Sequence, residues 1–140
     1  MNTSGLAVVR RVSGALHLFL AAAIVVAVCV QVYLIGAYIF GAGIGALDAH
    51  KDVGWTTHSL ELLLFLVALI AWLPGRDILL SLTLAVIGTV QVSLASGSEW
   101  VGALHPLFAL AVLTLAGLLA HRGLRRRGGG RRPAPATGQP

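Results

Sequence analysis

Four long uncharged runs divide this chain of 140 residues and limit what it can fold into. The runs cover residues 12–47, 53–75 (where Glu61 is the one exception), 78–98 and 100–121. An α-helix needs about 20 apolar residues to cross the hydrocarbon core of a bilayer, so each run is long enough to do so. Only 11% of the residues are charged, whereas soluble domains carry about a quarter. The composition therefore excludes an ordinary soluble domain.

The runs predict an all-α fold, an integral membrane antiparallel four-helix bundle built from two tandem helical hairpins. We expect helices near residues 13–40, 53–73, 78–95 and 101–120, separated by turns rich in glycine, proline and charged residues. Residues 1–12 would form a cytoplasmic N-terminus and residues 13–122 the transmembrane domain. Residues 123–140, rich in Gly, Pro and Arg without periodicity, are predicted to be a disordered basic cytoplasmic tail.

Basic residues indicate the orientation. Nine of the ten lie on one predicted side: Arg10, Arg11, Arg76 and six arginines between Arg122 and Arg132. Lys51 alone lies on the other side. The positive-inside rule then predicts a multi-pass protein of the bacterial plasma membrane with both termini in the cytoplasm and the loops around 41–52 and 96–99 outside. The terminal arginines are expected to contact anionic lipid headgroups, and we predict no nucleic-acid partner.

The two predicted hairpins resemble each other. The first contains Val30-Gln31-Val32, then Gly45-Ala46-Leu47 and His50; the second contains Val90-Gln91-Val92, then Gly102-Ala103-Leu104 and His105. The glutamine and the histidine are 19 residues apart in the first hairpin and 14 in the second, so a chance likeness between apolar hairpins stays open. If the repeat is real, His50 and His105 lie at one depth near the outer surface, on diagonally opposite helices.

Two imidazoles facing each other across a bundle can supply both axial ligands of a haem iron. We therefore predict that His50 and His105 bind haem b, with Gln31 and Gln91 as hydrogen-bond donors around it. Gly54 would let a bulky ring approach the second helix. Three alternatives stay open: histidines that are only hydrated at the outer headgroups, histidines that handle protons, and glutamines that join helices by hydrogen bonds.

Other ionisable residues lie deeper in the predicted membrane segments. His58 and Glu61 are three residues apart and can pair on one helix face. They would form either a satisfied polar pair or a proton relay that tunes the cofactor. His17 and His121, at the cytoplasmic ends of the first and last helices, suggest a second haem. However, His121 lies about 160° around the helix from His105, so both cannot face the centre of a straight bundle.

A resemblance to known families rests on the third and fourth helices. Residues 90–95 (VQVSLA) and 100–110 (WVGALHPLFAL) resemble a family of small uncharacterised bacterial four-helix membrane proteins. In that family His-x-x-x-Gly recurs on the second helix and Leu-His-Pro on the fourth. The likeness covers about residues 9–122 and implies the four-helix fold.

The same pattern, with His50 followed by Lys51, is similar to one half of the haem A synthase family. That likeness implies His50 and His105 as a pair of haem ligands. This chain has only one such half, its first outer loop has no cysteine pair, and its acid stands two residues before the histidine, at Asp48. Synthesis of haem A is therefore not implied. The His-Lys-x-x-Gly run also resembles bacterial b561-type cytochromes.

These observations predict a small membrane protein that carries electrons or handles haem, more an electron-transfer or accessory protein than an enzyme. Its expected partners are the lipid bilayer and a respiratory or haem-handling membrane complex, and a homo-oligomer stays open. One other class is a non-catalytic accessory or scaffold subunit without a cofactor. Another is a small proton-coupled transporter that uses Glu61, although small four-helix multidrug exporters carry their key glutamate on the first helix, where this chain has no acid.

Overall fold

The computed structural model of the chain describes residues 3–129, and these are helical apart from short connections. The elements are α1 (Thr3–Ile39), α2 (Ile44–Ile70), α3 (Gly75–Leu94), the single-turn α4 (Glu99–Gly102) and α5 (His105–Gly129). Three helices, α1, α2 and α3, and the segment 99–128 are each long and apolar enough to cross a membrane. The prediction of an all-helical chain with four candidate spans is therefore confirmed.

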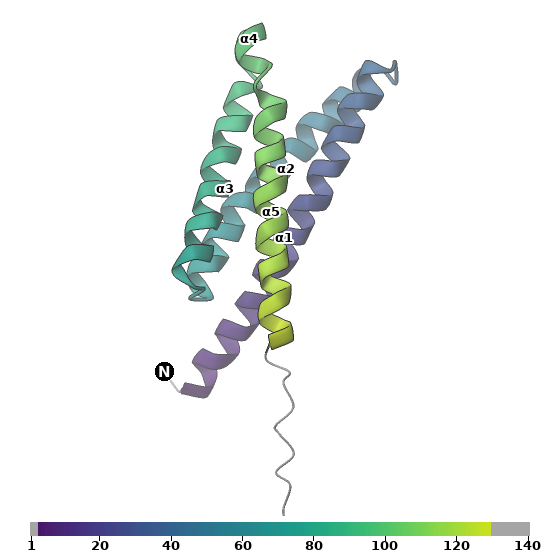
Figure 1. Ribbon diagram of the computed structural model, residues 1–140. Helices are drawn as coiled ribbons and strands as arrows, with labels where there is room; N and C mark the ends of the chain where they lie inside the picture. Colours follow the sequence, from purple (N-terminus) through teal and green to yellow (C-terminus); the bar gives the residue numbers. More distant parts are fainter. Residues whose placement is uncertain (1–2, 130–140) are drawn as a thin grey trace, which may run out of the picture.

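The four long helices pack side by side. Helix α1 packs against α2 and α5, and α3 also packs against α2 and α5, so α2 and α5 stand diagonally opposite each other. The α1–α2 turn and α4 lie at one end, which we call the loop end. The α2–α3 turn, the start of α1 and the end of α5 lie at the other, which we call the termini end (Figure 1). Toward the loop end the hairpin α1–α2 diverges from α3 and α5.

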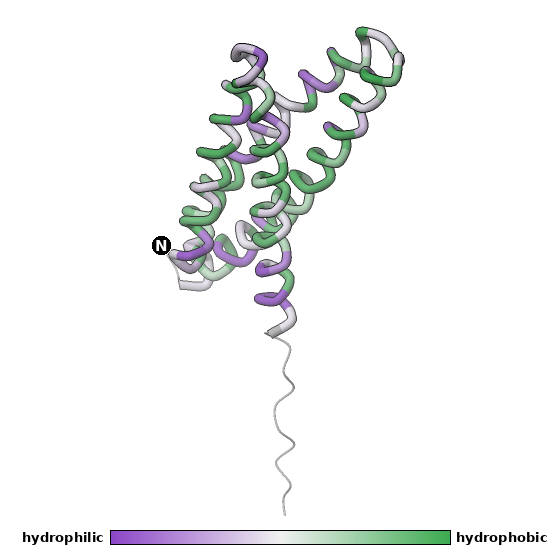
Figure 2. The backbone as a smooth tube through the Cα atoms, turned by 45° about the horizontal axis from the view of Figure 1, so that its top comes forward, coloured by the Kyte–Doolittle hydropathy of each residue, from purple (hydrophilic) through white to green (hydrophobic). Residues whose placement is uncertain are grey.

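Apolar side chains fill the middle of this arrangement and also cover its outside. Ile24, Leu64, Leu84 and Leu119 are fully buried, one from each long helix. Large apolar side chains such as Phe19 and Leu110 are exposed, and hydrophobic residues dominate the length of the helices in Figure 2. A surface of this kind is suited to contact with acyl chains rather than with water.

The two hairpins bury equivalent positions. Residues 60 apart correspond in α1 and α3, as Gln31 and Gln91 do, and residues 55 apart correspond in α2 and α5, as His50 and His105 do. Eight pairs in this register are buried in both copies: Ile24 and Leu84, Leu64 and Leu119, Glu61 and Ala116, Ala21 and Ser81, His17 and Asp77, Thr57 and Val112, Val28 and Gly88, and Ala68 and Gly123. The second hairpin therefore repeats the packing of the first.

Two helices start well before the predicted residue. Helix α1 begins at Thr3 rather than near residue 13, and α2 begins at Ile44 rather than near residue 53. The expected outer loop 41–52 is thus reduced to the turn at residues 40–43, because Ala and Leu favour helix there and Lys51 pairs with Asp48 one turn earlier (3.6 Å).

The predicted disordered tail also begins too early. Helix α5 continues to Gly129, so residues 123–129 are helical, and residues 130–140 lie outside the described residues. Arg122 and Arg126 bind the carboxylate of Asp77 on α3, which holds this last part of α5 against the rest of the protein. Arginines in a last turn also complement the negative end of the helix dipole.

Glycine is required at the turn between α1 and α2. Gly43 has φ 86° and ψ 179°, a conformation that essentially only glycine adopts. We expect Gly43→Ala to lower the free energy of unfolding by about 1–3 kcal/mol. Gly36→Ala is the matched control, because this glycine is inside α1 and nothing lies within 4 Å of an added Cβ. It should raise stability by up to about 1 kcal/mol. Thermal unfolding in detergent measures both, and equal effects would contradict the prediction.

Candidate functional site

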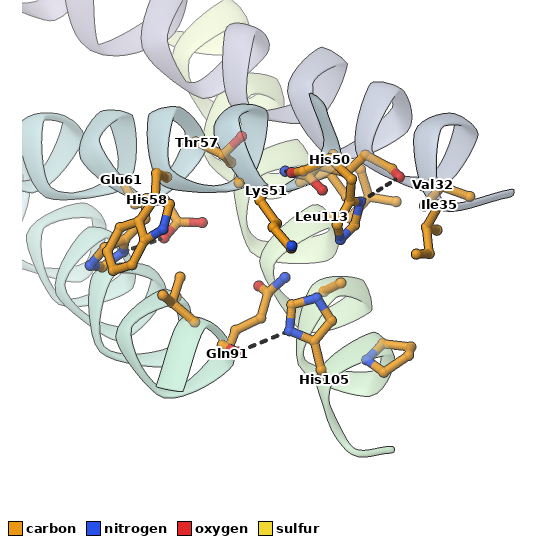
Figure 3. Close-up of a pocket in the computed structure, with 18 of the residues that line it drawn as sticks. Val32, Ile35, His50, Lys51, Thr57, His58, Glu61, Gln91, His105 and Leu113 are labelled. Carbon is orange, nitrogen blue, oxygen red and sulfur yellow. Dashed lines mark hydrogen bonds and ion pairs between the residues drawn. The ribbon is translucent and has the colours of Figure 1, made fainter. Parts of the chain in front are cut away.

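A cavity of about 390 Å³ lies between the two hairpins on the loop-end side of the core. This volume is within the usual range of about 300–1,000 Å³ for small-molecule sites. The lining is largely apolar, and its polar and titratable members are Gln31, His50, Lys51, Thr57, His58, Glu61, Gln91 and His105. Figure 3 labels all of them except Gln31 and shows that the labelled residues come from both hairpins and surround one space.

His50 and His105 face each other across this cavity. Their ring centroids are 6.2 Å apart and the ring planes meet at 68°. Nδ1 of His50 lies 3.1 Å from the main-chain carbonyl oxygen of Gln31, and Nδ1 of His105 lies 2.9 Å from that of Gln91. A carbonyl oxygen can only accept, so Nδ1 carries the hydrogen in both rings. A neutral ring with its hydrogen on Nδ1 keeps the lone pair on Nε2, and the two Nε2 atoms point toward one another in Figure 3.

The glutamines thus act mainly through their main chains, which the sequence did not indicate. The side chain of Gln31 donates from Nε2 to the carbonyl oxygen of His50 (2.9 Å) and so joins α1 to α2. Gly54 makes room for this amide, since an added Cβ would lie 2.9 Å from Nε2 of Gln31. Gly54 also lines the cavity, so the expectation that it admits a bulky ring stays a prediction. The side chain of Gln91 lies in the cavity beside His105.

The spacing of the two rings fits a metal held between them. A metal midway would lie 3.1 Å from each centroid, half of the measured 6.2 Å. A metal bound about 2 Å from a ring nitrogen lies roughly 3 Å from the ring centre. An Nδ1–H bonded to a main-chain carbonyl is also the usual support of a ligating histidine. No group of three or more His, Cys, Asp or Glu that could hold a metal occurs among residues 3–129, so the other ligands would have to come with the metal, as they do in a porphyrin.

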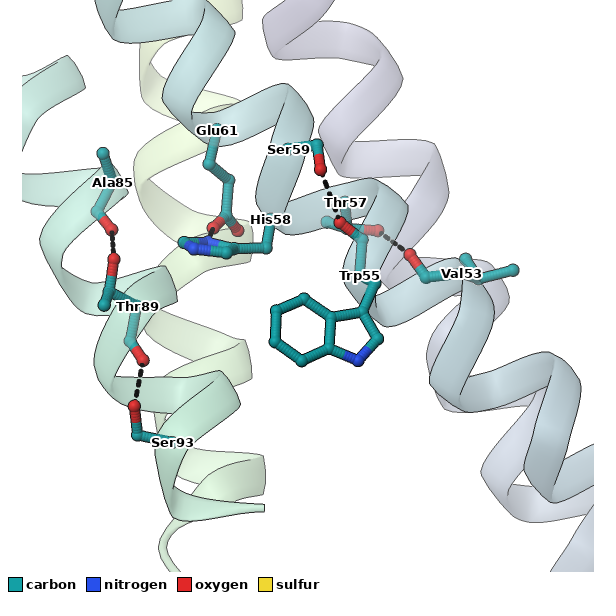
Figure 4. Close-up of polar contacts among 9 residues, drawn as sticks. All are labelled: Val53, Trp55, Thr57, His58, Ser59, Glu61, Ala85, Thr89 and Ser93. Carbon is teal, nitrogen blue, oxygen red and sulfur yellow. Dashed lines mark hydrogen bonds and ion pairs between the residues drawn. The ribbon is translucent and has the colours of Figure 1, made fainter. Parts of the chain in front are cut away.

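A second polar pair lies deeper in the same cavity. Nδ1 of His58 is 3.1 Å from Oε2 of Glu61, as the spacing predicted, and Glu61 is 2% exposed. Gly88 on α3 makes space for this carboxylate, because an added Cβ would lie 1.6 Å from Oε2. The indole of Trp55 stands edge-on to the His58 ring, with centroids 6.4 Å apart. Figure 4 shows the carboxylate and the imidazole directed toward each other beside α3.

Several lining residues were missed in the sequence, among them Lys51, Trp55 and Gly88. Lys51, Trp55 and His58 are spaced i, i+4 and i+7, which places them along one face of a helix. This pattern is visible only if the helix begins before Lys51, and the predicted start near residue 53 hid it. The ammonium of Lys51 points into the cavity in Figure 3.

The termini end carries a separate polar cluster. The buried Asp77 accepts hydrogen bonds from Arg122 and Arg126. The Ser81 hydroxyl donates to the Asp77 carbonyl (2.8 Å), so Nε2 of the buried His17 must donate to Ser81 (3.0 Å). His121 is exposed instead. The structure therefore does not bring His17 and His121 into a second haem site.

A scan against protein-family models found no match, and searches of the curated proteins and of the solved structures found none either. The likeness to membrane haem proteins therefore stays a prediction from sequence.

Proposed function

We propose that this chain is an antiparallel four-helix protein of the bacterial plasma membrane that binds b-type haem between His50 and His105. Both termini would be cytoplasmic, and the cavity would lie toward the outer leaflet. The haem would supply a one-electron couple for electron transfer or would be handed to a membrane complex. His50 and His105 would hold the haem iron in this proposal, and Lys51 would pair with a haem carboxylate.

One observation carries the proposal. In both hairpins an imidazole is held by Nδ1 on the main-chain carbonyl of an equivalent glutamine, which leaves two Nε2 atoms directed at one space. Two histidines wetted separately by headgroups would have no reason to share this arrangement. The apolar walls of the cavity, including Val32, Ile35 and Leu113, suit the faces of a porphyrin.

The test is the optical spectrum of the purified protein after expression with adequate haem. We expect a Soret band and sharp bands in the reduced-minus-oxidised spectrum. The double variant His50→Ala/His105→Ala should lose both, whereas His121→Ala should keep them because His121 is exposed and far from the cavity. A wild-type protein without a Soret band would overturn the proposal and favour an accessory or scaffold subunit.

A further inference from the structure

The His58–Glu61 pair has no part in holding haem, yet it lies in the same cavity. A carboxylate inside a membrane segment is costly and usually has a function. Glu61 is buried against Gly88 of α3 and bonded to His58. At the equivalent position of the second hairpin the chain has Ala116, which is also buried. The carboxylate is therefore not needed to fill this place in the fold.

The cavity connects the His58–Glu61 pair to residues at the loop end, and the apolar core separates the pair from the termini end. The cavity runs from His58 and Glu61 to His50, Lys51 and His105. On the other side lies the apolar core, whose buried members include Ile24, Leu64, Leu84 and Leu119. This core separates Glu61 from the polar cluster around Asp77. A proton can thus reach the pair through the cavity, whereas the core offers it no polar partner.

Few other titratable groups lie near enough to bind a proton in place of the His58–Glu61 pair. On α2 the nearest titratable cavity residues are His50 and Lys51 toward the loop end, and α5 contributes His105 at the same level. The cavity residues of α1 and α3 are uncharged. His58 is eight residues from His50 on one helix, which corresponds to about 12 Å. In an apolar cavity a charge change over such a distance is only weakly screened.

We propose, on the basis of the haem site above, that the His58–Glu61 pair binds one proton when the haem at His50 and His105 gains one electron. The electron comes from an external reductant and the proton from water at the loop end, so charge in the cavity stays balanced. Linkage is reciprocal: if reduction favours proton binding, proton binding raises the reduction potential. The potential must then fall as the pH rises, and the proton returns to the loop end on oxidation.

Redox titrations of the haem-loaded protein between about pH 6 and pH 9 test this proposal. In the wild type the midpoint potential should fall with pH, by at most about 59 mV per unit, the value of a tenfold change for a one-electron couple. Glu61→Gln should flatten the slope, and His58→Gln should flatten or displace it. His17→Gln is the matched control, since it makes the same substitution at a buried histidine that lies beyond the apolar core. Its slope should equal that of the wild type.

The outcomes separate this proposal from the haem site itself. A protein without haem bands refutes the haem site, whereas intact bands with the same slope in Glu61→Gln and wild type refute the proton site alone. In liposomes that enclose the termini, a change of the internal pH should leave the potential unchanged. A response to internal pH would overturn the route through the loop end.

Discussion

Replacing His105 with glycine is expected to lower the affinity for haem by at least about 100-fold and to leave the fold intact. Loss of a group that only orients a ligand already costs about 10–100-fold, so loss of a ligand should cost no less. His105 is the first residue of α5, where a glycine disturbs little of the helix. Haem titration followed by the Soret band measures the change, and circular dichroism checks the helix content.

Added imidazole distinguishes ligation from a structural role. If His105 acts through Nε2, free imidazole at millimolar concentration should enter the space left in His105→Gly and restore the spectrum of a haem with two nitrogen ligands. The same rescue is expected for His50→Gly. His121→Gly is the control and should bind haem like the wild type. Full haem binding by His105→Gly without imidazole would contradict the assignment.

Replacing Asp77 with alanine is expected to lower the free energy of unfolding by about 3 kcal/mol. Removal of one partner from a buried ion pair typically costs about 3–5 kcal/mol, because the remaining charge is left unpaired. The Asp77 carboxylate is buried and binds two arginines of α5 that are 28% and 32% exposed. Water can therefore reach the arginines partly, which places the cost at the lower end of that range. Unfolding in mixed detergent and dodecyl sulfate measures it.

Asp48→Ala is the control for Asp77→Ala. Asp48 also belongs to an ion pair, with Lys51 at 3.6 Å, but both side chains are 60% exposed. Exposed pairs of this kind contribute about 0.3–0.5 kcal/mol. An equally small loss in Asp77→Ala would mean that the arginines do not hold α5 against α3. That result would also remove our explanation for the helical conformation of residues 123–129.

Local spacing in the sequence was sufficient for part of the candidate site. His58 and Glu61 pair because residues three apart on a helix are neighbours, and no other element is needed for that contact. The repeat also placed His50 and His105 at equivalent positions, although their role as ligands stays a prediction.

Contacts between helices could not be predicted in the same way. Asp77 reads in the sequence as part of a turn, and its two arginine partners lie 45 and 49 residues later. The starts of α1 and α2 and the end of α5 were misplaced because glycines and charges near a helix end also suit a loop. In this chain tertiary contacts decide whether such a segment is a helix or a loop, as the ion pairs of Arg122 and Arg126 do for the end of α5.

Charge and hydropathy alone determined that this chain forms four long apolar helices. A long apolar run without charges is stable only in a lipid bilayer or in a buried protein core. Which side chains meet was decided by the tertiary structure. The rotation of each helix about its axis depends on packing against two neighbours, and uniformly apolar helices carry little information about it. Thus the distance from His50 to His105, the carbonyl groups that orient them and the apolar core beneath Glu61 follow only from the packed helices.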